Sequence, residues 1–139
     1  MNIYSGSREG RGLAAALTNP TEISLRKGTI KQPYPVVIYG HSFPDAETAY
    51  FALVKQHGAE GQVTTSDQIM VQVITAKFQQ HPRLQAAVLG LGGTKFLESC
   101  SHFTFAKTER FQKWEGVGRQ SRFIRNLIAG YESAILPPA

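Results

Sequence analysis

The chain has 139 residues, of which 42% are hydrophobic and 18% are charged, and its formal net charge is +5 at pH 7. This length and composition predict one globular domain, residues 1–139, and exclude an intrinsically disordered chain. No apolar run is long enough for a transmembrane helix, and the first residues lack the pattern of a signal peptide, so we expect a cytoplasmic protein with no membrane partner. The sequence pI near 9.6 favours anionic ligands.

The first twelve residues predict a short strand, 2–5, and a glycine-containing basic loop. The loop includes Gly6, Arg8 and Arg11. Glycines let backbone amides approach an anion, and arginines bind phosphate in a forked geometry. A phosphate-binding loop is therefore one interpretation, and an ordinary flexible loop is the other. A P-loop is excluded because no Lys-Ser or Lys-Thr pair follows the last glycine.

The stretch from Phe43 to Lys55 has the pattern of an amphipathic helix that begins with acidic residues. A predicted strand at 34–39 turns back at Gly40 and delivers the chain to this helix. Asp45 stands in the N-cap position, and Glu47 falls at the edge of the apolar stripe, where a side chain is half buried. Glu47 either complements the helix dipole or carries a carboxylate into a pocket. The residues of the apolar stripe are Ala46, Ala49, Tyr50, Leu53 and Val54.

Three further helices are predicted, at 66–80, from Pro82 to Gly92, and at 121–136. Thr65 to Gln68 has the spacing of a capping box for the first, and Ser121 is the N-cap of the last. Residues 94–100 predict a short strand or a helical turn, whereas 102–113 show no clear pattern. Pro137-Pro138 ends the last helix. The positions expected inside are Ile69, Met70, Val73, Ile74 and Phe78, then Leu84, Ala87, Val88 and Leu91, and finally Ile124, Leu127, Ile128, Tyr131 and Ile135.

The single cysteine, Cys100, cannot form an internal disulfide, which fits a reducing compartment. We expect it to be a buried structural thiol. None of the four histidines has metal-ligand spacing to another histidine, a cysteine or an acid, so we expect no metal and no cofactor.

A series of short motifs runs nearly end to end along the chain. They are Tyr4-Ser5, Leu17-Thr18-Asn19, Glu47-Thr48-Ala49-Tyr50, Lys77-Phe78 with Pro82-Arg83-Leu84, Gly92 to Leu97-Glu98, and Trp114 to Gly118. In this order they resemble the NADAR family, the YbiA-like proteins proposed to handle NAD and ADP-ribose derivatives. The resemblance implies a single compact α+β domain, mainly helical around a small β-sheet. Thr48 departs from the family, which commonly has histidine there, and the family's aspartate upstream of the tryptophan has no clear equivalent.

The resemblance implies a hydrolase, an N-glycosidase that cleaves a ribose C–N bond in an ADP-ribose-type or ribosylated nucleotide such as ADP-ribosyl-guanine. Glu47 would stabilise the positive charge that develops at the anomeric carbon. His102 or Glu115 would be the second catalytic group. The partner would be a nucleotide-type small molecule, an ADP-ribosylated base or an ADP-ribosylated nucleic acid. The expected substrate-binding residues are Ser5, Gly6, Arg8, Arg11, Asn19, Lys27, Tyr50, Trp114, Gly116 and Arg119.

Two alternatives stand beside the enzyme. The first is a non-catalytic module of the same fold that binds a nucleotide or ADP-ribose. The second is a basic nucleic-acid-binding protein, although the chain lacks both a recognition helix and a strand with alternating aromatic and basic residues.

Overall fold

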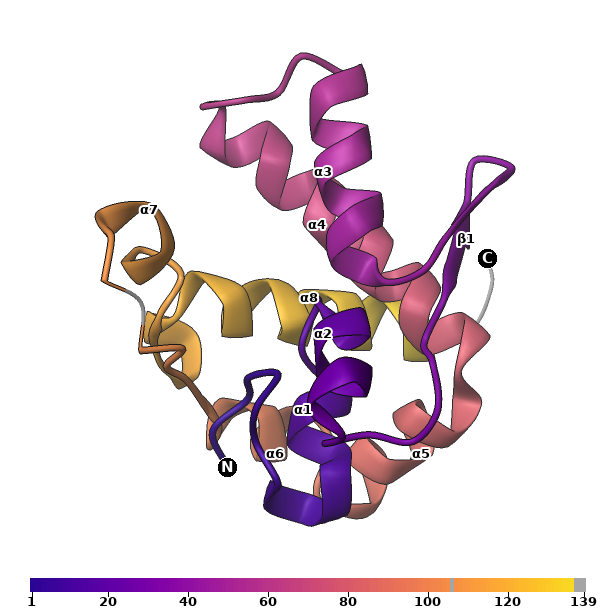
Figure 1. Ribbon diagram of the computed structural model, residues 1–139, viewed down its shortest axis with the longest axis vertical. Coiled ribbons are helices and arrows are strands. Elements are labelled where there is room, and N and C mark those ends of the chain that lie inside the picture. Colours follow the sequence, from indigo (N-terminus) through magenta and orange to yellow (C-terminus); the bar gives the residue numbers. More distant parts are fainter. Residues whose placement is uncertain (106, 137–139) are drawn as a thin grey trace.

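The computed structural model describes residues 1–105 and 107–136, and Figure 1 shows the arrangement of their helices and strands. The fold is a single α+β unit dominated by helices, as the sequence predicts. Short 3-10 turns occur at Glu9–Gly12 and Gly118–Gln120. The helices are α1 (Leu13–Ala16), α2 (Thr21–Lys27), α3 (Ala46–Gln56), α4 (Val63–Gln80), α5 (Pro82–Gly90), α6 (Thr94–Glu98), α7 (Glu109–Gln112) and α8 (Arg122–Ile135). The strands are β1 (Val36–Ile38), β2 (His41–Phe43), β3 (Ser101–His102) and β4 (Gly116–Val117).

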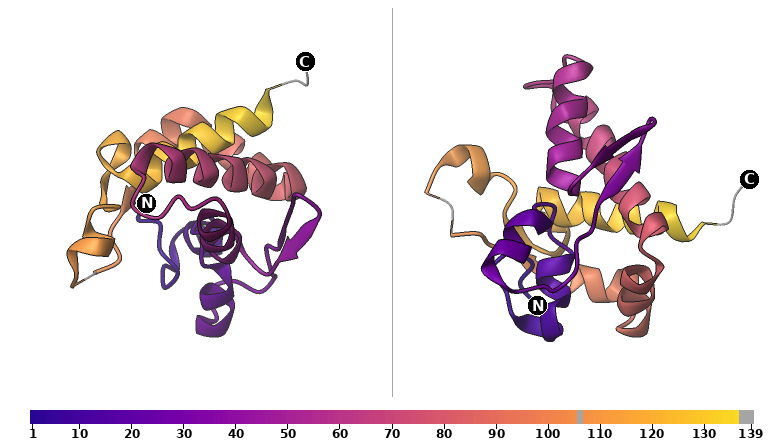
Figure 2. Two further views of the ribbon diagram at one scale, coloured as in Figure 1. Left: turned by 90° about the horizontal axis from the view of Figure 1, so that it is seen from above. Right: turned by 45° about the vertical axis from the view of Figure 1, so that its right-hand side comes forward.

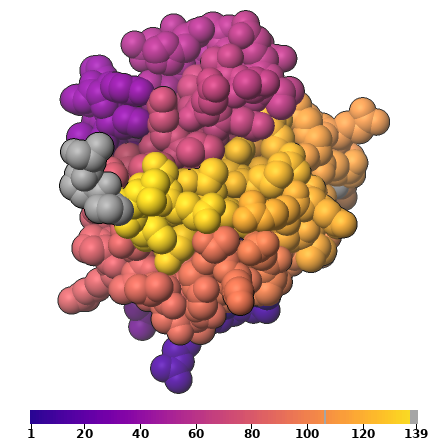
Figure 3. All heavy atoms as spheres, turned by 180° about the vertical axis from the view of Figure 1, so that it is seen from behind, coloured from indigo at the N-terminus to yellow at the C-terminus, as the bar shows by residue number. Residues whose placement is uncertain are grey.

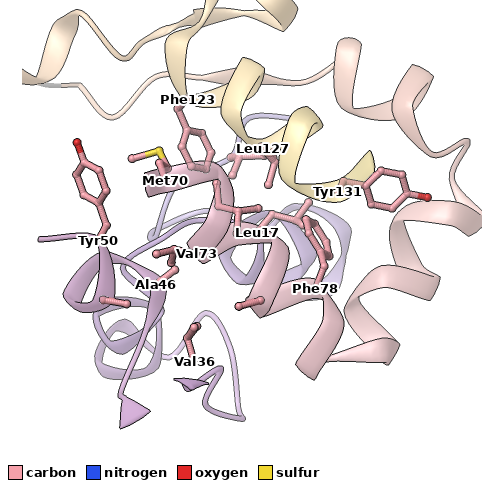
Figure 4. Packing of buried hydrophobic residues seen from close by; sticks show 14 of the residues in the cluster. Leu17, Val36, Ala46, Tyr50, Met70, Val73, Phe78, Phe123, Leu127 and Tyr131 are labelled. Carbon is pink, nitrogen blue, oxygen red and sulfur yellow. The ribbon is translucent and has the colours of Figure 1, made fainter. Parts of the chain in front are cut away.

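The centre of the fold is the packing of α4 against α8. The space-filling view from behind shows α8 lying across the middle of the molecule, between the region of α3 and α4 and that of α5 and α6 (Figure 3). A Cβ atom on Gly130 would collide with the side chain of Ile74, so the glycine lets the two helices approach closely. Their facing apolar side chains, together with Leu17 of the first turn, form one continuous core (Figure 4).

Helix α3 stands beside the first part of α4 and begins at a side-chain cap. Oδ1 of Asp45 accepts a hydrogen bond from the Thr48 amide at 2.8 Å, as predicted for an N-cap. The other carboxylate oxygen of Asp45 accepts the Glu22 amide of α2 at 3.1 Å. Asp45 therefore fixes the start of α3 and the start of α2 relative to each other.

The strands form two separate two-stranded antiparallel ladders. In the first, Val36 pairs with Phe43, and the hairpin stands out to one side of the helices (Figures 1 and 2). Gln80 holds the hairpin by donating to the Val37 carbonyl and accepting from its amide. In the second ladder, His102 pairs with Gly116.

The predicted strand at 2–5 is wrong. Only Asn2 bridges, in parallel fashion, to Ser101, and Ile3 donates its amide to the same residue at 2.8 Å. The segment has no second residue in ladder register because the chain turns at residues 4–7, where the Ser7 amide donates to the Tyr4 carbonyl at 3.1 Å.

Several element boundaries and faces also differ from expectation. Helix α4 starts at Val63 with Gln62 as N-cap, so the predicted capping box lies inside the helix, where the amides bond to the preceding carbonyls. Leu91 and Ile135 are exposed, at 54% and 46%, because each lies at a helix end beyond the packed surface. Residues 94–98 are helical, as one of the two alternatives had it, and Pro137-Pro138 lies outside the described residues.

Within residues 1–105 and 107–136, every helix is too short or too polar to span a bilayer.

Candidate functional site

A cavity of about 540 Å³ opens between α3, the α1–α2 loop, the first turns of α4, and the residues on either side of α7. This volume lies in the range of sites for small organic molecules. Apolar and aromatic side chains supply most of its wall, with a few charged groups among them. Concave apolar surface with convergent polar groups is the usual form of a small-molecule site.

Glu47 lies half buried at this cavity, in the first turn of α3. Burial raises the pKa of its carboxyl to about 7, and the nearby negative charge of Asp45 adds to the effect. Near neutral pH the carboxyl therefore exists in both protonation states, which is the condition for giving and taking a proton. The position at the edge of the helix stripe, read from the spacing, is the cause of this partial burial.

The backbone around Glu47 is held by the α1–α2 loop. The Glu47 amide donates to the Asn19 carbonyl at 3.2 Å. Asn19 itself is buried and lines the cavity. The carbonyls of Ala16 and Thr18, just before it, accept hydrogen bonds from the buried amine of Lys77, at 2.6 and 2.7 Å.

His102 also lines the cavity, and its ring is oriented by the N-terminal segment. Its Nδ1 lies 2.6 Å from the Ile3 carbonyl oxygen. A carbonyl only accepts, so Nδ1 carries the hydrogen and Nε2 is the acceptor of the neutral ring. Burial lowers the pKa of His102, against the hydrogen bond to Ile3 and the charge of Glu115. The imidazole packs on Phe123 with ring centroids 4.5 Å apart.

Trp114 supplies an aromatic wall that two neighbours fix in place. Tyr50 meets its ring edge-on, with centroids 6.1 Å apart. The guanidinium of Arg122 lies over the indole, with Cζ 3.7 Å from the centroid. Arg122 in turn donates to Asp67 at 2.7 Å and to Ser66 at 3.1 Å. All three members of the stack line the cavity.

Positive side chains supply an attraction for anions at the rim. Lys27 is exposed, donates to Ser5 Oγ at 2.9 Å, and lines the cavity together with Ser5. Arg110 and Lys113, in and just after α7, also line it, as does the exposed acid Glu60. Because these three cations outnumber Glu60 among the exposed charged residues of the lining, the site suits a ligand that carries a negative group.

The structure brings together about half of the residues predicted from the sequence. Those that line the cavity are Ser5, Asn19, Lys27, Glu47, Tyr50, His102 and Trp114. Those that do not are Gly6, Arg8, Arg11, Glu115, Gly116 and Arg119.

Physical reasons account for the residues outside the cavity. Arg8 and Arg11 are exposed in and beside the 3-10 turn at 9–12, and no residue of that turn lines the cavity. Arg119 pairs with Glu98 on the surface at 3.1 Å. Glu115 accepts the amide and hydroxyl of Thr104, at 2.6 and 2.9 Å, and so tethers a neighbouring loop. Gly116 belongs to β4, where the Ser121 backbone fills the space that a Cβ would need.

Sequence reasoning missed Lys77 and Arg122. A signal for Lys77 was present, since it falls one helical turn after Val73 on the buried stripe of α4. Arg122 gave no such signal, because its partner Asp67 is distant in sequence.

Within the described residues, no group of three or more His, Cys, Asp or Glu side chains could hold a metal ion.

Comparison with known proteins overturns the family resemblance drawn from the motifs. No family model matches the chain, and no solved structure matches it. The chain is 34% identical over 104 residues to a glutamate racemase of Haemophilus ducreyi. The alignment covers 69% of this chain and 35% of that protein, so the chain spans about a third of the length of the relative it matches.

The NADAR assignment and the predicted N-glycosidase function are therefore wrong, since the similarity found is to a racemase and not to a hydrolase. The error has a physical origin. The motifs that suggested the family are two to seven residues long, and a turn or helix edge in an unrelated protein can require the same residue types. What the comparison favours is an enzyme of another kind.

Proposed function

We propose that this chain is an enzyme of the racemase or isomerase type, which moves a proton on a small anionic substrate. The single observation that carries the proposal is Glu47, a half-buried carboxyl at the cavity whose pKa is raised to about 7. A general acid–base group works best when its pKa lies near the pH at which it operates. Glu47 meets this condition without a metal ligand set around it among the described residues.

His102 provides the second acid–base group. Its neutral imidazole, with Nδ1–H held by Ile3, leaves Nε2 free of the proton and able to accept one. Inversion at a carbon requires that one group removes a proton and another returns one to the opposite face. Glu47 comes from α3 and His102 from β3, so the two groups enter the cavity from separate elements.

The substrate class follows from charge and from the relative. Lys27, Arg110 and Lys113 at the rim favour a carboxylate or phosphate. The named relative is a glutamate racemase, and glutamate carries two carboxylates and an exchangeable α-proton. Because the chain corresponds to only 35% of that protein, glutamate is the first substrate to test and not a conclusion.

The test is hydrogen exchange at carbon. The protein is incubated with L-glutamate, and separately with D-glutamate, in D₂O, and loss of the α-proton signal is followed by NMR. We expect exchange from at least one enantiomer, with a loss of roughly a hundredfold or more in Glu47→Gln. Glu98→Gln, an exposed carboxyl that does not line the cavity, is the matched control and keeps the parent rate. Absence of exchange from both enantiomers, with the protein folded, would reject glutamate as substrate.

A nucleotide-type partner is the second candidate, and the aromatic lining favours it. Tyr4, Tyr50, Phe51, Trp114 and Phe123 all line the cavity, which is more aromatic surface than a small aliphatic acid needs. Aromatic side chains bind the faces of planar rings. Calorimetric titration with AMP and with ribose 5-phosphate tests whether the cavity binds the planar base or only the phosphate. Tighter binding of AMP would support a planar ligand, whereas equal affinities would show that only the phosphate is recognised.

A further inference from the structure

The strongest feature that the proposed mechanism leaves unused is the side chain of Lys77. It lies in the last turn of α4 and is only 2% exposed. It does not line the cavity, so it touches no ligand there. A buried amine is costly unless its donors are satisfied, and a hydrophobic residue would suit the same face of the helix.

The amine donates its hydrogen bonds to one short segment, residues Ala16 to Asn19, which we name the 16–19 turn. Nζ donates to the Ala16 carbonyl at 2.6 Å and to the Thr18 carbonyl at 2.7 Å. These carbonyls lie at the end of α1, where a helix leaves acceptors without intrahelical partners. Lys77 thus holds the turn from α4, about sixty residues further along the chain.

The same turn leads directly to the acid–base group. Asn19, its last residue, lines the cavity. Its carbonyl accepts the amide of Glu47 at 3.2 Å and the amide of Thr21 at 2.9 Å. A continuous path of hydrogen bonds and one peptide link therefore runs from Lys77 through Thr18 and Asn19 to the first turn of α3.

We propose that Lys77 is a positioning residue for the candidate site: by fixing the 16–19 turn, its amine keeps the Glu47 carboxyl in its desolvated place at the cavity. Capping the end of α1 is served by the same two hydrogen bonds, so stability alone does not separate the two roles. What separates the capping role from the positioning role is the pKa of the Glu47 carboxyl. If the turn moves, water reaches the carboxyl, and its pKa returns toward the ordinary value of 4.5.

The charged and titratable surroundings of Lys77 support a coupling of this kind. Burial lowers the pKa of its amine to about 7, while Asp45 opposes that change. Asp45 belongs to the cap of α3, two residues before Glu47. From the segment before β1, the ring of Tyr34 lies 5.7 Å from Nζ. Asp45 therefore influences both Lys77 and Glu47, with its charge favouring the protonated form of each.

The experiment follows the Glu47 carboxyl carbon by NMR across pH in the parent, in Lys77→Met and in Ile128→Ala. Ile128→Ala removes buried apolar volume on α8 but none of the hydrogen bonds that Lys77 makes to the 16–19 turn, and it serves as the destabilised control. We expect the Glu47 pKa to fall by about one unit or more in Lys77→Met and to stay near the parent value in Ile128→Ala. An unchanged Glu47 pKa in a folded Lys77→Met protein would reduce Lys77 to a structural cap and overturn the inference.

A second measurement covers the case in which Lys77→Met does not fold. In Glu47→Gln, which removes the titrating carboxyl at the cavity, the amide signals of Thr18 and Asn19 are followed while Lys77 itself is titrated. We expect these amides to shift with the same midpoint as the Lys77 side chain. Amides that stay fixed through that midpoint would overturn the inference. The inference rests on the proposed function only for its meaning in catalysis, because neither measurement uses a substrate. If the parent protein shows no proton exchange, the proposed function is rejected, whereas the effect of Lys77 on Glu47 can still be measured.

Discussion

The guanidinium of Arg122 lies over the indole ring of Trp114, with Cζ 3.7 Å from the ring centroid. Cation–π stacking of this kind is attractive, and it is stronger where water is excluded. Arg122 is buried, and its Nε also forms an ion pair with Asp67 at 2.7 Å. The stack therefore ties the aromatic wall of the cavity to the first turns of α4.

We predict that Arg122→Met lowers the free energy of unfolding by about 2–4 kcal/mol, because it leaves the Asp67 carboxylate partly buried without its cation. The Trp114 fluorescence should change as well, since the ring loses its stacked neighbour. Urea denaturation and emission spectra measure both effects. Arg125→Met is the matched control, because Arg125 is an exposed residue of the same helix that bonds to the Arg119 carbonyl. It should cost less than about 1 kcal/mol.

A second prediction concerns Asp45, whose two oxygens serve different helices. Asp45→Ala removes the cap of α3 and the acceptor for the Glu22 amide, so the free energy of unfolding should fall by about 2–3 kcal/mol. The Glu47 pKa should fall in the same variant, since the charge of Asp45 helps to raise it. Thermal unfolding and an NMR titration measure the two effects.

Asp45→Asn separates the two roles of that carboxylate. The amide oxygen can still cap α3, so stability should suffer less, while the loss of charge still lowers the Glu47 pKa. If the Glu47 pKa is unaffected by either substitution, burial alone sets it.

The pH dependence of stability gives a third prediction. The folded-state pKa of Glu47, about 7, lies above its ordinary value of 4.5. Between these pH values the folded state binds the extra proton, so the contribution of Glu47 to stability is fully present below pH 4.5 and is lost as the pH rises through 7. Glu47→Gln should therefore be more stable than the parent by about 1–3 kcal/mol at pH 8, and the advantage should shrink toward pH 5.

Lys77 changes the pH dependence of stability in the opposite direction to Glu47, so both proteins in that comparison must retain it. Its pKa is lowered from 10.5 to about 7, so the unfolded state binds the extra proton between these values and stability rises with pH there. Comparing Glu47→Gln with the parent at each pH cancels this contribution. A difference between the two that does not vary from pH 5 to pH 8 would contradict the raised pKa of Glu47.

Cys100 gives a fourth prediction. Its side chain is fully buried, its Sγ donates to the Phe96 carbonyl at 3.3 Å, and burial raises the pKa of the thiol. We expect slow reaction with a thiol reagent at pH 8 in the native protein and fast reaction in urea, because only the thiolate reacts and only unfolding exposes it. Cys100→Ser should retain any proton-exchange activity, since Cys100 does not line the cavity. Rapid labelling of the native protein would show that the thiol is accessible.

Much of the local structure could be predicted from the sequence. The apolar spacing predicted helices at 66–80 and 121–136, and the structure has α4 at Val63–Gln80 and α8 at Arg122–Ile135. The capping roles predicted for Asp45 and Ser121 are confirmed. Helix ends were less accurate, because the start of α4 depends on the turn at Gly58 to Gly61 and not on the hydroxyls that follow.

The candidate site was only partly predictable. Glu47 could be placed at the margin of α3, since the position of a residue on a helix follows from its own spacing. That Asn19, His102 and Trp114 share a cavity with it could be expected only from the motif resemblance, which the comparisons overturned. The basic loop of Arg8 and Arg11 shows the same limit, because its charge and glycines were read correctly and its direction relative to α3 was not.

The sequence by itself determined the four longest helices, α3, α4, α5 and α8, the residues that cap two of them, and that Glu47 stands between the core and the solvent. The tertiary structure alone decided that Arg122 stacks on Trp114, that Lys77 holds the 16–19 turn, and that the cavity excludes Glu115 and Arg119. The physical reason is the range of the interactions. Helix periodicity and capping act over about four residues. The stacked, buried and cavity-lining groups meet across 8 residues of chain, between Trp114 and Arg122, to about 100, between Ile3 and His102, and their distances are set by how α4 packs against α8 and the first turns of the fold.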